Sequence, residues 1–311
     1  MEKPFYLAPM AELSHRALRE LIEHFGGCDC YFSEMISASA VFAGGPYEKW
    51  YLDAGPKPEK LVFQLVGSAP EVISRAAAFL DRQECAGIDI NMGCSAPLIR
   101  KTGAGAAWMA SIDRAGDLIS LIRPLITRRL SVKLRIGFKD DFDYLVRFCR
   151  RLEEAGAELI TLHPRLVTEK FKRLARWEYV GLLRKELKIP VAGNGDIASP
   201  EDLVRRAAGP CDAVMVGRAA VRMPWIFAEG RGVEKEAQTE RHFEEIGLRF
   251  LELLSMYQPP DFHVSRAKRF FSFFCDNLKW GTFLKNQINR EDTLMGIIQI
   301  WQNYFKENSG L

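Results

Sequence analysis

Short apolar runs alternate with amphipathic segments from Phe5 to Val216. A short apolar run bounded by glycine, proline or polar residues is typical of a buried strand, whereas apolar positions three and four apart indicate a helix. The predicted strands are Phe5–Ala8, Tyr31–Ser33, Leu61–Val66, Gly87–Asn91, Ser131–Arg135, Leu159–Leu162, Val191–Gly193 and Ala213–Val216. The predicted helices among them are Ser14–Phe25, Pro70–Arg82, Asp113–Ile126, Phe142–Ala155, Trp177–Leu187 and Pro200–Ala208.

This alternation predicts an α/β protein with a (β/α)8 TIM barrel rather than an open doubly wound sheet. Residues 34–60, rich in glycine and proline, are expected to form an insertion with at most a short helix. After Arg241 the chain predicts only helices, at His242–Tyr257, Ser265–Leu278 and Leu294–Phe305. We therefore expect a catalytic barrel in residues 1–238 and a small helical domain in residues 239–311, joined by a polar linker.

Composition narrows the class of protein. A chain of 311 residues with 48% hydrophobic content can bury a full core. The first residues lack the apolar core of a signal peptide, and no apolar run reaches the roughly 18 residues of a membrane span. Seven widely spaced cysteines are typical of a reducing compartment, so a cytoplasmic protein with no membrane association is expected. Cys28 and Cys30 lack partner ligands nearby in the sequence, and no metal site is predicted.

The net charge of +3 permits a nucleic-acid partner without requiring one. The basic residues are concentrated in two segments, which could be ordinary solvated faces or could bind a polyanion. The first segment contains Arg165, Lys170, Lys172, Arg173 and Arg176, and the second contains Arg266, Lys268, Arg269, Lys279, Lys285 and Arg290.

Nearly all the predicted strands carry polar groups or glycines at or near their C-terminal ends, where barrels build their active sites. These positions are Pro9-Met10-Ala11, Glu34, Gln64, Asn91 with Cys94, Lys133 with Arg135, His163 with Arg165, Asn194-Gly195-Asp196, and Gly217-Arg218. Gly195 and Gly217 can present backbone N–H groups, and Arg218 can add a charged fork. Asn194-Gly195 alone is more typical of a tight turn, but beside Gly217-Arg218 it favours a phosphate site.

The remaining polar strand ends leave alternatives open. Lys133 needs an anion, which a structural ion pair or a ligand can supply. His163 is either a satisfied core histidine or a site residue. Gln64 can bond a heterocycle's amide-like edge or simply neighbouring backbone.

Cys94 lies in a polar, glycine-rich loop after the fourth strand. A thiol with an ordinary pKa of about 8.5 is largely protonated at neutral pH and can donate a proton without an activating base. The alternative is a small buried cysteine. The loop is not a dinucleotide fingerprint, since the third glycine after Gly103 and Gly105 would fall at Trp108.

Taken together, these segments resemble the tRNA-dihydrouridine synthase family of flavin enzymes. The resemblance rests on Ala-Pro9-Met10, Ser-Glu34, Phe-Gln64-Leu, Asp-Ile-Asn91-Met-Gly-Cys94, Gly-Ala-Gly105-Ala, Ser-Val-Lys133-Leu-Arg, Leu-His163-Pro-Arg165, Asn194-Gly195-Asp196 and Val-Gly217-Arg218. It implies FMN at the barrel mouth, NADPH or NADH as electron donor, and reduction of the C5–C6 bond of uridine in tRNA. It also implies that Cys94 protonates C5 after hydride reaches C6.

The resemblance further assigns residues to ligands. The implied FMN-binding set is Pro9, Met10, Ala11, Gln64, Lys133, His163, Asn194, Gly195, Asp196, Gly217 and Arg218. The implied substrate-binding set is Asn91, Arg135, Arg165, Arg266, Lys268 and Arg269, with tRNA as the partner and no obligate protein partner.

The chain differs from the family pattern in the two segments that the resemblance places next to the substrate. Ser95 replaces the usual proline after the cysteine, and the usual His-Gly-Arg-Thr after strand six reads His163-Pro164-Arg165-Leu166, although Trp177 is kept. Two other hypotheses therefore stand: an FMN barrel acting on a free pyrimidine, and a non-catalytic tRNA-binding protein. The modified uridine position is not predicted.

Overall fold

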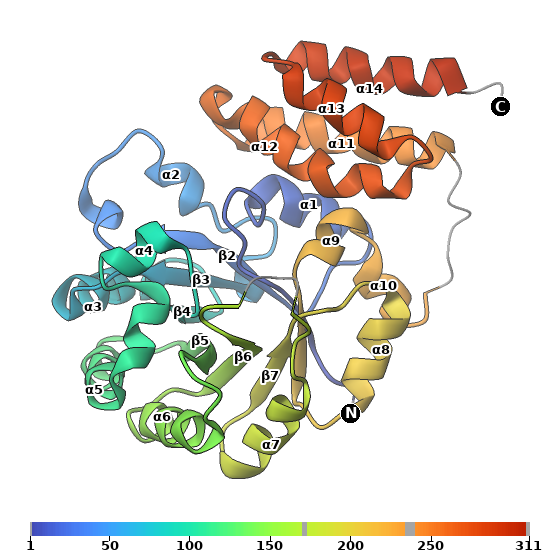
Figure 1. Cartoon of the computed structure of the whole chain (residues 1–311). Helices are drawn as coiled ribbons and strands as arrows, with labels where there is room; N and C mark the ends of the chain where they lie inside the picture. The colour runs from blue at the N-terminus through green and yellow to red at the C-terminus, as the bar shows by residue number, and fades with distance from the viewer. Residues whose placement is uncertain (1, 170–172, 234–239, 309–311) are drawn as a thin grey trace.

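The computed structural model describes residues 2–169, 173–233 and 240–308. Parallel strands β1 to β8 pair in chain order, and β8 pairs with β1 to close a barrel (Figure 1). The strands are β1 (Phe5–Leu7), β2 (Cys30–Ser37), β3 (Leu61–Val66), β4 (Gly87–Met92), β5 (Arg129–Gly137), β6 (Leu159–Leu166), β7 (Val191–Asn194) and β8 (Ala213–Val216). The predicted TIM barrel is confirmed. The expected domain boundary, between residues 238 and 239, lies outside the described residues.

Strand β6 runs further than predicted. Arg135 of β5 pairs with His163, but Gly137 pairs with Leu166, so β6 carries one extra residue between these pairs. Such a bulge suits Pro164, which has no N–H group for the ladder. His163 and Arg165 are consequently held within a strand and not in the loop that the sequence predicted.

Helices cover the outside of the barrel (Figure 1). All six predicted helices of the barrel are present: α1 (Arg16–His24), α3 (Pro70–Asp81), α5 (Ile112–Ile122), α6 (Phe142–Glu154), α7 (Glu178–Glu186) and α8 (Pro200–Ala208). The third ends earlier than predicted, in a 3-10 turn, because Pro124 cannot continue an α-helix. The 34–60 insertion holds short helices at Ala40–Phe42 (η1), Glu48–Tyr51 (α2) and Pro58–Lys60 (η2). The unpredicted short helices are α4 (Pro97–Lys101), η3 (Gly105–Ala110), α9 (Arg218–Arg222) and α10 (Ile226–Gly230).

The C-terminal helices pack together beside the barrel (Figure 1). They are α11 (Glu240–Tyr257), α12 (Pro260–Phe274), η5 (Cys275–Asn277), α13 (Gly281–Arg290) and α14 (Leu294–Asn308). Their core includes a stacked pair, Phe250 and Phe270, with ring centroids 3.7 Å apart, and buried Trp301. Helix α13 has no clear apolar pattern in the sequence, because it buries little more than Leu284 and Ile288.

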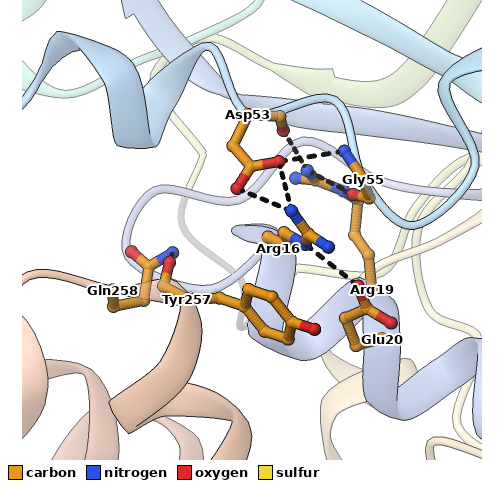
Figure 2. A network of polar contacts seen from close by, with 7 residues as sticks. All are labelled: Arg16, Arg19, Glu20, Asp53, Gly55, Tyr257 and Gln258. Atoms are coloured by element: carbon orange, nitrogen blue, oxygen red, sulfur yellow. Dashed lines mark hydrogen bonds and ion pairs between the residues drawn. The ribbon is translucent and has the colours of Figure 1, made fainter.

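A polar network joins α1, the insertion and the end of α11 (Figure 2). The Arg16 guanidinium lies 3.9 Å from the Tyr257 ring centroid and donates to both Asp53 carboxylate oxygens at 3.0 and 3.1 Å. Arg19 donates to the Gly55 carbonyl from Nε and Nη2, at 3.0 and 2.8 Å. These hydrogen bonds fix the insertion against α1, and the contact of Arg16 with Tyr257 links α1 to α11. No helix in the part of the chain with described structure is long and apolar enough to cross a membrane.

Candidate active site at the barrel mouth

A cavity of about 550 Å³ opens at the C-terminal ends of the strands. The C-terminal helices contribute to its wall through Arg269 and Phe273 of α12. The lining residues are Ala8, Pro9, Met10, Ala11, Leu13, Met35, Asn91, Gly93, Cys94, Ser95, Ala96, Lys133, Arg135, His163, Arg165, Asn194, Gly195, Asp196, Ile197, Met215, Gly217, Arg218, Arg269 and Phe273. Volumes of this order accommodate cofactors and drug-sized ligands.

The charge of this lining is strongly positive. It includes five cations, Lys133, Arg135, Arg165, Arg218 and Arg269, against the single carboxylate of Asp196. Burial, with a smaller contribution from Arg135, lowers the pKa of Lys133 to about 8. Burial and the neighbouring Arg165 also lower the pKa values of Arg135 and Arg218. A bound anion would relieve this repulsion, so the cavity favours an anionic ligand.

His163 is held in one protonation state by its neighbours. Burial, followed by the charges of Lys133, Arg135, Arg165 and Arg218, lowers its pKa well below the usual range. Arg165 Nη1 lies 2.8 Å from His163 Nε2, and a guanidinium can only donate. The imidazole is therefore neutral, accepts at Nε2 and carries its proton on Nδ1.

Asp196 ties the β6 and β7 ends together. Its Oδ1 accepts from Arg165 Nη2 at 2.5 Å, and its Oδ2 accepts from the Ala175 backbone N–H at 2.6 Å. At the preceding Gly195, φ is +122°, and an added Cβ would lie 3.0 Å from His163 Cδ2. Trp177 donates from Nε1 to the Gly195 carbonyl at 2.8 Å. This turn is thus rigid and requires glycine.

The Cys94 loop is pinned from both sides. Asn91 Oδ1 accepts from the backbone N–H groups of Gly93 and Cys94, at 3.2 and 2.9 Å, and the Cys94 carbonyl accepts from Ala106 N at 2.9 Å. Gly105 has φ of +59°, and a Cβ there would lie 2.7 Å from the Cys94 carbonyl oxygen. Cys94 is partly exposed in the cavity, whereas the other six cysteines are buried.

The structure brings most of the residues predicted to bind FMN to this cavity. Those that line it are Pro9, Met10, Ala11, Lys133, His163, Asn194, Gly195, Asp196, Gly217 and Arg218. Gln64 is the exception. It is fully buried one layer deeper, with Nε2 donating to Asp89 Oδ2 and Oε1 accepting from Asn91 Nδ2, both at 2.7 Å.

The residues predicted to bind substrate divide into two groups. Asn91, Arg135, Arg165 and Arg269 line the cavity. Lys268 does not, and its Nζ lies 3.5 Å from Asp292. Arg266 does not line the cavity either, since its guanidinium is buried and pairs with Glu34 at 2.9 Å. Lys170 and Lys172 of the first basic segment lie outside the described residues.

The Arg135 guanidinium donates hydrogen bonds to backbone carbonyl groups. Its Nε donates to the Gly93 carbonyl at 3.1 Å, and its Nη1 donates to the Leu166 and Glu169 carbonyls at 2.9 and 3.3 Å. It therefore links the Cys94 loop to the end of β6.

Sequence reasoning missed several contributors. Met35, Ile197, Met215 and Phe273 line the cavity, but an apolar side chain gives no signal of this in a single sequence. Asp89 could have been recognised from the sequence, because a carboxylate in a wholly buried strand requires hydrogen-bond donors around it. Among residues 2–169, 173–233 and 240–308, no group of three or more His, Cys, Asp or Glu side chains could hold a metal ion.

Comparison with solved structures supports the fold. A structure described as a variant of NCR from Zymomonas mobilis matches 76% of this chain and 89% of its own, with a TM-score of 0.51 and 15% sequence identity. This likeness bears on the fold alone.

Sequence comparisons bear on the family. A probable tRNA-dihydrouridine synthase of Aquifex aeolicus is 33% identical over 274 residues, covering 84% of this chain and 81% of that protein. The tRNA-dihydrouridine synthase B of Xanthomonas campestris pv. campestris is 26% identical over 306 residues, covering 96% and 92%. The family model described as Dihydrouridine synthase (Dus) matches residues 6–297. The chain therefore belongs to the dihydrouridine synthase family.

Proposed function

We propose that this protein is a tRNA-dihydrouridine synthase that reduces the C5–C6 double bond of uridine in tRNA. The observation that carries the proposal is the placement of one accessible thiol, Cys94, in the same cation-lined cavity as Lys133 and His163. Family membership and the relatives' names agree with this activity.

The cavity fits FMN as the cofactor. Its excess of cations suits a phosphate and the negative charge of a reduced flavin ring, and Gly195 and Gly217 leave backbone uncovered on one wall. Asn194, Gly195, Gly217 and Arg218 would hold the phosphate end. Pro9, Met10 and Ala11 would cover the ring, and Lys133 would stabilise negative charge on it. When bound and reduced by NADPH or NADH, the flavin would supply hydride to C6 of uridine.

The chain's own residues would complete the reaction. Cys94 holds a proton at Sγ and delivers it to C5, which completes addition of two hydrogens across the double bond. The neutral His163, protonated on Nδ1, can donate a hydrogen bond without adding charge. Asn91 and Arg135 keep the Cys94 loop in place through its backbone.

The RNA has to present its uridine in an extruded form, because a base stacked inside folded RNA cannot enter a cavity in the protein. Arg269 stands at the cavity wall with its side chain half exposed. It is the described member of the second basic segment best placed to meet a phosphate of the flipped nucleotide.

The test is to purify the protein, record its visible spectrum, and incubate it with NADPH and tRNA lacking dihydrouridine, beside a Cys94→Ala control. A yellow protein that forms dihydrouridine, with the control strongly impaired, supports the proposal. A yellow protein that reduces free pyrimidines but not tRNA would replace it with the small-molecule hypothesis. A colourless protein that still binds tRNA would favour a binding-only role.

A further inference from the structure

A chain of buried hydrogen bonds runs inside the barrel from β5 to the Cys94 loop. Ser131 Oγ donates to Asp89 Oδ1 at 2.6 Å, and Gln64 Nε2 donates to Asp89 Oδ2 at 2.7 Å. Asn91 Nδ2 then donates to Gln64 Oε1 at 2.7 Å. Asn91 Oδ1 receives the backbone N–H groups of Gly93 and Cys94. Every side chain in the series is buried.

The two ends of this series fix the direction of every bond in it. An ionised carboxylate only accepts hydrogen bonds, so Asp89 requires the NH₂ side of the Gln64 amide. With the Gln64 NH₂ group directed at Asp89, Gln64 Oε1 faces Asn91, and Asn91 must donate to it from its own NH₂ group. Asn91 Oδ1 is then left facing the loop, where the backbone N–H groups can only donate. Each amide has one orientation that satisfies both neighbours, and both constraints agree.

We propose that Asp89 is a positioning residue for Cys94, acting through Gln64 and Asn91. It touches neither the cavity nor the thiol, and its effect reaches Cys94 through the orientation of two amide groups. This assignment deepens the proposed function, since it concerns the residue expected to supply the proton. It also explains why Gln64, near the C-terminal end of an apolar strand, lies below the cavity lining.

The charge state of Asp89 supports this role at neutral pH. Burial raises its pKa to about 6, against the lowering effect of the bonds from Ser131 and Gln64. At pH 7 the group is therefore mainly the carboxylate that the hydrogen-bond directions require.

Two substitutions at position 89 separate positioning from simple stability. In Asp89→Asn, the amide oxygen can still accept from Gln64, while its NH₂ donates to the Ser131 hydroxyl, so the orientation is retained. In Asp89→Leu, Gln64 loses the acceptor that orients it. Leu183→Ala, at a buried position of α7, serves as a core variant on an element that contributes no residue to this series.

The first readout is alkylation of Cys94 by iodoacetamide at pH 7, followed by peptide mass spectrometry. The other six cysteines are buried, so native-state alkylation reports mainly on Cys94. It does not depend on catalysis, and a failure of the proposed function would leave it intact. We expect a several-fold change of rate in Asp89→Leu at temperatures well below its melting point, and near wild-type rates in Asp89→Asn and Leu183→Ala.

The second readout is single-turnover reduction of tRNA. Displacement of the thiol predicts a loss on the order of tenfold to a hundredfold in Asp89→Leu, with Asp89→Asn much closer to wild type. Equal alkylation rates in Asp89→Leu and wild type would overturn the proposal, whatever the stability of the variant. Equal effects of Asp89→Leu and Leu183→Ala on both readouts would also overturn it.

Discussion

Glu34 of β2 and Arg266 of α12 form a buried ion pair between the barrel and the C-terminal helices, with Glu34 Oε2 2.9 Å from Arg266 Nη1. The other carboxylate oxygen accepts from the Glu12 backbone N–H at 2.6 Å. Glu12 has φ of +64° and directly follows Pro9-Met10-Ala11, which lines the cavity. One carboxylate therefore joins the position of α12 to the conformation of the loop expected to cover the flavin.

Removal of the arginine should destabilise the protein strongly. Arg266→Met leaves Glu34 buried without its partner, and such a break costs about 3–5 kcal/mol in free energy of unfolding. Chemical denaturation followed by fluorescence measures this loss. The double variant Glu34→Leu/Arg266→Met should recover much of it, because no unpaired charge remains.

A matched control is available across the same junction. The Tyr47 hydroxyl donates to Asp261 Oδ2 of α12 at 2.9 Å on the exposed side. Asp261→Asn should leave the unfolding midpoint nearly unchanged. If Arg266→Met proved no more destabilising than Asp261→Asn, the buried pair would not be what secures α12.

FMN affinity should depend on the protonation of Lys133. Its pKa of about 8 means that the cation is lost as the pH rises from 7 to 9, and attraction for an anionic ligand falls with it. Quenching of flavin fluorescence should show weaker binding across this window, with a shallower dependence in Lys133→Met. The comparison is repeated in Cys94→Ala, so that the thiol in the same cavity cannot account for the difference.

The free energy of unfolding of the flavin-free protein should change with pH in the opposite direction, increasing as the pH rises and Lys133 loses its proton. Its folded pKa lies below the unfolded value, so the fold disfavours the charged form. This contribution to stability is present above the unfolded pKa and is lost as the pH falls through about 8.

The prediction for FMN binding has its own contradicting outcome. An FMN affinity independent of pH between 7 and 9 would show that Lys133 does not face the cofactor's charge.

Gly195→Ala should weaken FMN binding more than strain alone predicts. Its added Cβ would lie 3.0 Å from His163 Cδ2 and 3.2 Å from Ala175 Cβ, displacing the imidazole and the turn. Gly44→Ala is the matched control, since Gly44 also has positive φ, at +66°, but meets nothing within 4 Å. Isothermal titration with FMN should find a large loss only in Gly195→Ala. Comparable affinities in the two variants would argue against a phosphate site at this turn.

The barrel and its mouth were predictable from the sequence because both follow from local patterns. Apolar runs locate the strands, and the polar ends of those runs locate Cys94, Lys133 and His163, which meet in one cavity. The family resemblance drawn from these residues is confirmed by the comparisons.

The roles of Arg266 and Gln64 could not be predicted, because they depend on contacts between residues distant in the sequence. Glu34 and Arg266 are 232 positions apart, and nothing near Arg266 distinguishes a buried partner of a carboxylate from a surface cation that meets phosphate. The resemblance assigned Gln64 to the flavin because it lies near the C-terminal end of its strand, whereas the barrel register places it beside Asp89. Pairing across the barrel thus decides which polar side chains remain available to ligands.

The contrast between Arg269 and Lys268 gives a test of how the helical domain meets RNA. Arg269 borders the cavity, whereas Lys268 lies near Asp292 and away from the lining. Arg269→Ala should weaken tRNA binding and reduce the slope of log affinity against log salt by about one unit, as expected for one lost phosphate contact. Lys268→Ala should change both much less. Filter binding at several salt concentrations measures the two slopes, and a larger loss in Lys268→Ala would place the RNA on the other face of α12.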